Sequence, residues 1–273
     1  MRLDDSNQEP AIRHAGSFAV FDAHLHIVDR RFPLVANNGF VPDPFSVQDY
    51  LRRMAAYRLT GGAVVSGSFQ AFDQTYLLAA LTRLGERFVG VTQLPADVSD
   101  RTVLDLDAAG VRAVRFNLRR GGSEDARHLD RMARRVHALA GWHIELYVDA
   151  SELPALEPML AELPAVSVDH LGLSAAGLPT LLRLAERGVR VKATGFGRVD
   201  FDVANALRHI HAVNPHALMF GTDLPSTRAP RAYADSDFDL IADVLGAEAA
   251  HDVLYRNAID FYRPQTVRKG DIP

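Results

Sequence analysis

Eight short segments rich in β-branched and other apolar residues recur along this sequence, and stretches with helical spacing separate them. The apolar segments are 19–27, 61–67, 88–94, 111–118, 143–150, 165–172, 189–196 and 217–225. The clearest helical stretches are 46–59, 73–88, 125–141 and 178–188, and the last helix is expected at 237–262. Regular alternation of strand and helix predicts a parallel sheet with right-handed crossovers. Eight strands that are apolar on both faces favour a closed (β/α)8 TIM barrel over an open doubly wound sheet.

The chain has 273 residues, which suits one such barrel without a second domain. Residues 1–16 are polar and are expected to form a short flexible N-terminal arm, with the barrel domain at 17–273. Gly110, Gly141 and Gly188 stand where predicted helices end, which suits C-terminal caps. No glycine-rich GxGxxG turn follows the first segment, which argues against dinucleotide binding.

Composition limits the partners and the chemistry. The 30 basic and 34 acidic residues give a net charge of −4, and no stripe of basic and aromatic residues suggests nucleic acid binding. The chain has no cysteine, so a metal would need histidine and carboxylate ligands. Without the apolar core of a signal peptide or a long apolar run, a cytoplasmic location and no membrane partner are expected. A homo-oligomer remains open.

The first apolar segment contains an HxH pair, His24 and His26. Side chains on a strand alternate between faces, so Asp22, His24 and His26 are expected to share one side and point at one place. A second HxH pair, His209 and His211, lies in a helical setting, where residues two apart do not face each other. The histidines expected to be solvated or structural are His128, His137, His143, His209 and His211.

Polar residues also follow most of the other predicted strands. In TIM barrels the active site lies at the C-terminal ends of the strands, so these side chains are expected to converge there. Each has a structural alternative: a single histidine often fills a core, and a lone aspartate often caps a turn or helix. The residues at predicted strand ends are Ser66, Ser68, Arg115, Asn117, Tyr147, Asp149, Asp169, His170, Lys192, Thr194, Arg198 and Asp223.

Six motifs together resemble the amidohydrolase superfamily, in particular the branch that contains 2-pyrone-4,6-dicarboxylate lactonases. They are DAHLHI, VRAVRFNL, HIELYVDASELP, VDHLG, VKATGFGRV and FGTDLPSTRAP, in the order and spacing of that branch. The resemblance implies a TIM-barrel hydrolase in which Asp223 takes a proton from water as general base. It also implies that His24, His26 and His170 surround the scissile carbonyl as the oxyanion develops.

The resemblance further implies that arginines grip a substrate carboxylate, at positions matched here by Arg115 and Arg198. A buried salt bridge with Asp149 or Asp169 is the alternative for either arginine. The remaining predicted substrate-binding residues are Ser68, Asn117 and Tyr147.

Three positions depart from the relatives. Tyr147 stands where metal-using relatives have a histidine, as it does in the metal-free lactonases, so the expected cofactor is either none or one zinc or manganese ion. The best metal set from the sequence is His24, His26 and Asp223. Phe40 replaces a tyrosine of the lactonases, and Gly121 replaces an arginine, with Arg119 and Arg120 only nearby. These changes favour a monocarboxylate or less polar lactone over a dicarboxylate pyrone.

Three functions follow from these observations. The first is a lactonase or related carboxylic ester hydrolase acting on a small acidic substrate. The second is a metal-dependent amidohydrolase or decarboxylase on a similar substrate. The third is a catalytically silent barrel that binds a small acid, which the presence of Asp223 and both strand-one histidines argues against.

Overall fold

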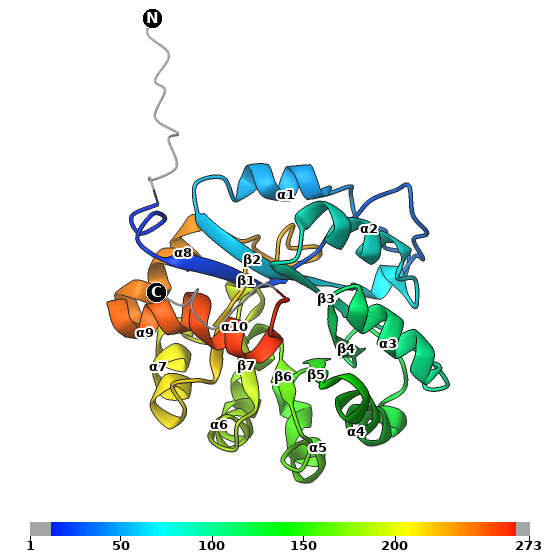
Figure 1. Ribbon diagram of the computed structural model, residues 1–273. Helices are drawn as coiled ribbons and strands as arrows, with labels where there is room; N and C mark the ends of the chain where they lie inside the picture. Colours follow the sequence, from blue (N-terminus) through cyan, green and yellow to red (C-terminus); the bar gives the residue numbers. More distant parts are fainter. Residues whose placement is uncertain (1–11, 266–273) are drawn as a thin grey trace, which may run out of the picture.

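The computed structural model describes residues 12–265 and shows eight strands in chain order, surrounded by helices (Figure 1). Each strand pairs in parallel with the next, from β1 to β8. The predicted (β/α)8 barrel is confirmed. The strands are β1 (Ala19–Leu25), β2 (Arg58–Val65), β3 (Phe88–Thr92), β4 (Val111–Asn117), β5 (His143–Tyr147), β6 (Val166–Val168), β7 (Arg190–Ala193) and β8 (Leu218–Phe220).

The helices pack outside the strands and bury one apolar face each. Gly141 ends α4 with φ 68°, the left-handed conformation that glycine adopts without strain. None of the helices within residues 12–265 has both the length and the apolar character needed to cross a membrane. The helices are α1 (Val47–Arg53), α2 (Thr75–Leu84), α3 (Asp100–Ala108), α4 (Leu129–Ala140), α5 (Leu153–Leu160), α6 (Leu178–Glu186), α7 (Val203–Val213), α8 (Asp235–Leu245), α9 (Ala247–His251) and α10 (Asn257–Tyr262).

The single final helix expected at 237–262 is wrong in extent. Gly246 has φ 80°, which ends α8, and α9 and α10 follow with a π-helical turn between them. This segment lies across the N-terminal end of the barrel (Figure 1), where the Tyr262 ring stacks on Phe21 at 5.6 Å. The Tyr262 hydroxyl donates to the Ala23 carbonyl at 3.2 Å. The barrel is therefore filled at this end, and the C-terminal ends of the strands remain for a site.

Hydrogen bonds beyond the strands join β1 to the segment that follows β8. The Asp223 N–H donates to the His24 carbonyl at 2.7 Å, and the His26 N–H donates to the Leu224 carbonyl at 2.8 Å. Gly221 permits this approach, because a Cβ there would lie 2.7 Å from the His24 backbone nitrogen. We call this junction the β1–β8 seam. It fixes the backbones of His24 and Asp223 relative to each other.

The predicted placement of Asp22 beside His24 and His26 is wrong. The Asp22 carboxylate turns toward α1 and the seam, where it accepts from the Tyr50 hydroxyl at 3.0 Å and the Thr222 hydroxyl at 2.7 Å. The pairing of β1 with β2 shifts register between Asp22 and Leu25. Such an irregularity breaks the strict alternation of side chains, so Asp22 and His24 lie on different faces.

Part of the predicted N-terminal arm, residues 1–11, lies outside the described residues. The rest of the arm contacts α8. The backbone N–H groups of Arg13 and His14 both donate to the buried Asp239 carboxylate, at 3.1 and 3.0 Å. Residues 12–16 are therefore attached to the barrel.

Candidate active site

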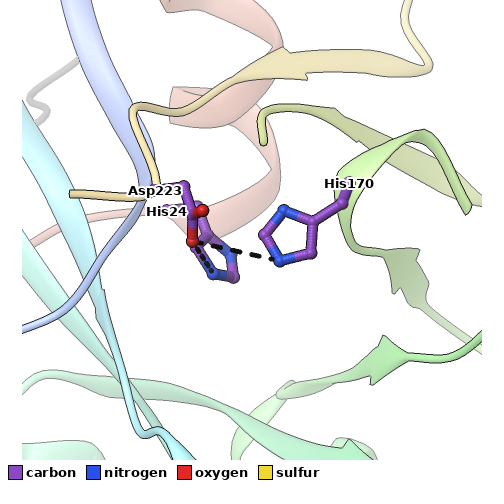
Figure 2. A group of neighbouring side chains, drawn as sticks. All are labelled: His24, His170 and Asp223. Carbon is purple, nitrogen blue, oxygen red and sulfur yellow. Dashed lines mark ion pairs between the residues drawn. The ribbon is translucent and has the colours of Figure 1, made fainter. Parts of the chain in front are cut away.

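Three side chains predicted from separate strand ends converge at the C-terminal end of the barrel (Figure 2). Asp223 Oδ1 lies 3.8 Å from His24 Nε2 and 4.0 Å from His170 Nε2. His26 Nε2 approaches the same oxygen to 3.6 Å. All four side chains are buried, and neither Asp223 Oδ1 nor His24 Nε2 has a hydrogen-bond partner within the described chain. Three imidazoles thus surround one free carboxylate oxygen.

The other oxygen of Asp223 is occupied. Arg198 Nε donates to Asp223 Oδ2 at 2.7 Å, and Arg198 Nη2 also donates to the Thr227 carbonyl at 3.0 Å. Burial alone would raise the pKa of Asp223, but the charge of Arg198 and the neighbouring histidines hold that pKa well below its usual value. Asp223 is therefore ionised at neutral pH.

Burial favours the neutral form of His24 and His170, and a hydrogen bond orients His26. Burial lowers the pKa of His24 well below its usual value and that of His170 to about 3. His26 Nδ1 lies 2.7 Å from the Val65 carbonyl oxygen and donates to it, which leaves a lone pair on its Nε2. That lone pair and Asp223 Oδ1 are both acceptors, so a proton, a water molecule or a cation is needed between them.

A buried charge network lies beneath His24. Lys192 Nζ is 2.5 Å from Glu145 Oε2 and 3.2 Å from His24 Nδ1, and Asp169 Oδ1 is 3.4 Å from the same His24 nitrogen. Burial raises the pKa of Glu145, whereas the pKa of Asp169 lies well below its usual value because Arg115, His24 and Lys192 outweigh its burial. The alternating charges hold the imidazole of His24 in place.

Arg115 adopts the salt-bridge alternative that the sequence left open. Its Nη2 and Nε donate to Asp169 Oδ2 at 2.6 and 3.2 Å, and its Nη1 donates to the Ser66 carbonyl at 2.8 Å. All three nitrogens are therefore engaged within the protein. In Arg198, by contrast, Nη1 makes no hydrogen bond to any described residue. Substrate binding by either arginine stays a prediction.

The remaining predicted substrate residues occupy distinct positions around the mouth. The Tyr147 ring packs edge-on against the His170 ring at 5.1 Å. Asn117 Oδ1 accepts from the Arg120 N–H at 3.0 Å and so orders the segment after β4. Ser68 Oγ accepts from Arg228 Nη2 at 2.9 Å. Asp149 instead caps a short 3-10 helix after β5, accepting from the Ser151 N–H.

A narrow hollow with a volume of about 20 Å³ lies between the side chains at the mouth. Two arginines in its lining, Arg120 and Arg228, are absent from the predicted site, although each lies within three residues of a predicted strand end. A search extended a few residues past each strand would have included them. The polar side chains of the lining are His26, Ser68, Arg115, Asn117, Arg120, Tyr147, His170, Arg198, Asp223, Thr227 and Arg228.

Comparison with known proteins agrees with this geometry. The sequence pattern that defines the amidohydrolase family matches residues 21–263, which is nearly the whole barrel. The chain belongs to the amidohydrolase family. The matched range includes every residue of the convergent site, from His24 to Asp223.

Two curated relatives of this amidohydrolase have names that refer to cyclic esters. The 2-pyrone-4,6-dicarboxylate hydrolase of Comamonas testosteroni is 31% identical over 157 residues, covering 55% of this chain and 51% of that protein. The chain thus matches about half the length of this relative. The D-galactarolactone isomerase of Agrobacterium fabrum is 28% identical over 236 residues, covering 78% of this chain and 80% of that protein.

A solved structure shares the fold. An apo crystal structure of an Agrobacterium tumefaciens protein superposes with a TM-score of 0.80 at 24% sequence identity, covering 91% of this chain and 97% of the other. At this identity the likeness establishes the barrel architecture alone.

The donor set in this amidohydrolase fits a divalent metal ion. One atom each from His24, His170 and Asp223 lies within 4.8 Å of the others, and all three residues are buried. Imidazole nitrogen and carboxylate oxygen suit zinc or manganese, and three such ligands leave a position for water or substrate. The sequence gave His26 in place of His170 in this triplet. His26 Nε2 also lies 3.6 Å from Asp223 Oδ1 while its Nδ1 bonds the Val65 carbonyl, so His26 stays a predicted ligand.

The histidines predicted to be structural lie away from this site. His209 and His211 lie on α7, as predicted, and His143 opens β5 at the opposite end of the barrel. A larger hollow of about 290 Å³ lies on the outside, beside Leu81 and Phe88. Its lining contains no histidine and a single carboxylate, Glu86, whereas His26, His170 and Asp223 line the smaller hollow.

Proposed function

We propose that this amidohydrolase hydrolyses a small carboxylate-bearing lactone or a related ester. The observation that carries the proposal is the ionised Asp223 Oδ1, which has no hydrogen bond within the described chain and faces three imidazole nitrogens within 4.0 Å. A carboxylate acceptor at the base of a hollow is what general-base activation of water requires. The relatives support a cyclic ester, because a pyrone and a lactone are both rings closed by an ester.

In the proposed reaction Asp223 accepts a proton from water as the water oxygen bonds to the lactone carbonyl carbon. The carbonyl electron pair moves onto its oxygen. When this pair returns, the ring C–O bond breaks and the departing alkoxide takes the proton from Asp223, which regenerates the carboxylate. One lactone and one water give one ring-opened hydroxy acid.

The imidazoles assist these reaction steps through their hydrogen bonds. The Lys192 ammonium has only donors, so at 3.2 Å it donates to His24 Nδ1 and leaves the His24 proton on Nε2. That N–H faces the reacting space and can donate to the developing oxyanion. His26 Nε2 carries a lone pair and can accept from the attacking water.

A second candidate is a metal-dependent amidohydrolase or decarboxylase, which the close approach of His24, His170 and Asp223 favours. These residues would hold one zinc or manganese ion, which would polarise the substrate carbonyl and lower the pKa of a bound water. In that case His24 would present a lone pair at Nε2 and would donate its Nδ1 proton toward Asp169 in place of accepting from Lys192.

Product analysis and metal analysis test the proposal together. The purified protein is incubated with carboxylate-bearing γ-lactones, δ-lactones and 2-pyrones, and NMR identifies a ring-opened acid, an isomeric lactone or no product. The wild type should open at least one lactone, and Asp223→Asn should not. Elemental analysis, and activity after dialysis against a chelator, separate the two candidates. Substrate binding without turnover by the wild type across the panel would contradict the lactone hydrolase.

A further inference from the structure

We infer that Arg228 and Arg120 form a carboxylate-binding subsite at the mouth of the hollow, and that it selects lactones carrying an acidic substituent. The inference rests on the proposed function and identifies the side chains that recognise the charge of the substrate. The subsite is built from segments after β4 and β8, apart from the Asp223 carboxylate.

The charges of the hollow are unevenly compensated. Four arginines line it, and two of them have acidic partners: Arg115 pairs with Asp169, and Arg198 pairs with Asp223. Arg120 and Arg228 form no ion pair with any residue from 12 to 265. The positive charge available for an anionic ligand is therefore that of Arg120 and Arg228.

Neutral groups hold Arg228 in place. Its Nη2 donates to Ser68 Oγ and its Nη1 donates to Asn37 Oδ1, both at 2.9 Å. The guanidinium lies over the Phe40 ring, 4.6 Å from its centre. Its Nε is buried and has no hydrogen-bond partner within the described chain. The fork is thus oriented in advance, while its charge and one donor remain unsatisfied.

Arg120 is brought beside Arg228 by the same asparagine. Asn37 Nδ2 donates to the Arg120 carbonyl at 3.1 Å, while Asn37 Oδ1 accepts from Arg228. Burial and the charge of Arg120 both lower the pKa of Arg228. Two neighbouring cations without an acid repel each other, and a bound carboxylate relieves this repulsion.

The subsite also accounts for two departures from the lactonase pattern. Phe40 lacks the hydroxyl of the expected tyrosine, and its ring instead supports the guanidinium of Arg228. Gly121 lacks the expected cation, and Arg120 supplies one from the preceding position. A monocarboxylate lactone therefore finds a recognition site that differs in its residues from the one the sequence predicted.

The test compares coumalate, a 2-pyrone with one carboxylate, with its uncharged methyl ester. Arg228→Met and Arg120→Met should each raise the KM for coumalate by about 10 to 100 times, as expected for hydrogen bonds to a charged group. Each variant should change kcat/KM for the methyl ester by less than about threefold. Arg228→Lys should recover part of the coumalate affinity, because it restores the charge without the planar fork.

Arg119→Met is the matched control, because Arg119 is exposed and lies next to Arg120 without lining the hollow. Arg119→Met should leave kcat/KM unchanged for both substrates. Circular dichroism establishes that each variant is folded. Equal losses on coumalate and its ester, or a coumalate defect in Arg119→Met as large as that in Arg228→Met, would overturn the subsite.

A binding measurement separates this inference from the proposed function. Isophthalate cannot be hydrolysed, and calorimetry measures its affinity for the wild type and for Arg228→Met. If the wild type opens no lactone of the panel but binds isophthalate in a manner that requires Arg228, the subsite stands and the hydrolase proposal fails. If pyrones are opened while neither KM nor isophthalate affinity depends on Arg228, the subsite fails and the hydrolase proposal stands.

Discussion

Replacing Asp22 tests whether a buried carboxylate at the β1–β8 seam costs the protein stability. Asp22 Oδ1 accepts from the N–H groups of His24 and Thr222, and Oδ2 accepts from the hydroxyls of Tyr50 and Thr222. In Asp22→Asn the oxygen can keep both backbone bonds, while the new NH2 group donates to the two hydroxyl oxygens. In Asp22→Ala two buried N–H groups lose their acceptor.

The expected pH dependence follows from the shifted pKa. Burial raises the pKa of Asp22 from 3.8 to about 6, despite its hydrogen bonds. Between these values the folded state binds a proton that the unfolded state has lost, so wild-type stability falls as pH rises from about 4 to about 6. The difference of about two pKa units corresponds to about 3 kcal/mol at pH 7. Asp22→Asn should lack this fall and should be more stable than the wild type above pH 6.

Urea denaturation at several values between pH 4 and pH 8 measures the effect. Trp142 is the only tryptophan and is buried, so its fluorescence reports unfolding. Asp22→Ala should lose roughly 2 to 6 kcal/mol, because each of the two orphaned backbone N–H groups costs about 1 to 3 kcal/mol, whereas the hydroxyls can rotate. A wild type that gains stability over Asp22→Asn as pH rises from 4 to 6 would refute the reasoning, since it would show that the four donors hold the pKa low.

Three further changes test the site. Asp223→Asn should remove nearly all turnover and leave binding intact; if more than about a tenth of kcat remained, a barrier change of only ~1.4 kcal/mol, Asp223 would not be the base. His24→Ala should abolish turnover and His209→Ala should be neutral in the same assay, so equal losses would contradict the placement of β1 and α7. Arg115→Met should lower the free energy of unfolding by about 3 to 5 kcal/mol, because Asp169 would lose its buried partner. It should also reduce kcat/KM equally for coumalate and its methyl ester, and a loss confined to coumalate would assign carboxylate binding to Arg115.

The barrel and the centre of the site could be predicted because few folds satisfy the sequence pattern. Eight apolar segments alternating with helices admit a closed parallel barrel, and parallel strands bring their C-terminal ends together. His24, His170 and Asp223 therefore converge, although up to 199 positions separate them in the sequence. The end of α8 could not be predicted, because a glycine such as Gly246 can either end a helix or lie within one that continues.

Side-chain direction and pairing could not be predicted, because they depend on contacts distant in sequence. The side of β1 that Asp22 occupies follows from a register shift against β2, which leaves no mark in the alternation of β1 itself. Arg115 and Asp169 were both expected at strand ends, but their spacing does not tell whether a carboxylate of the protein or of a substrate fills the guanidinium fork. Arg228 reaches the hollow through the conformation of the loop after β8, which strand patterns do not describe.

The backbone conformation of three residues at the site positions their side chains. His170, Asp223 and Arg228 have φ values of 52°, 60° and 58°, a left-handed conformation that is uncommon for residues other than glycine and asparagine. Each such residue costs free energy, of order 1 to 3 kcal/mol, and glycine would avoid the cost but would remove a side chain that the proposed function requires. The bond from the Asp223 N–H to the His24 carbonyl stabilises this conformation while it positions the carboxylate among the imidazoles. The β1–β8 seam therefore contributes both to the stability of the barrel and to the position of the Asp223 carboxylate. A substitution that weakens its hydrogen bonds should lower kcat before it unfolds the barrel.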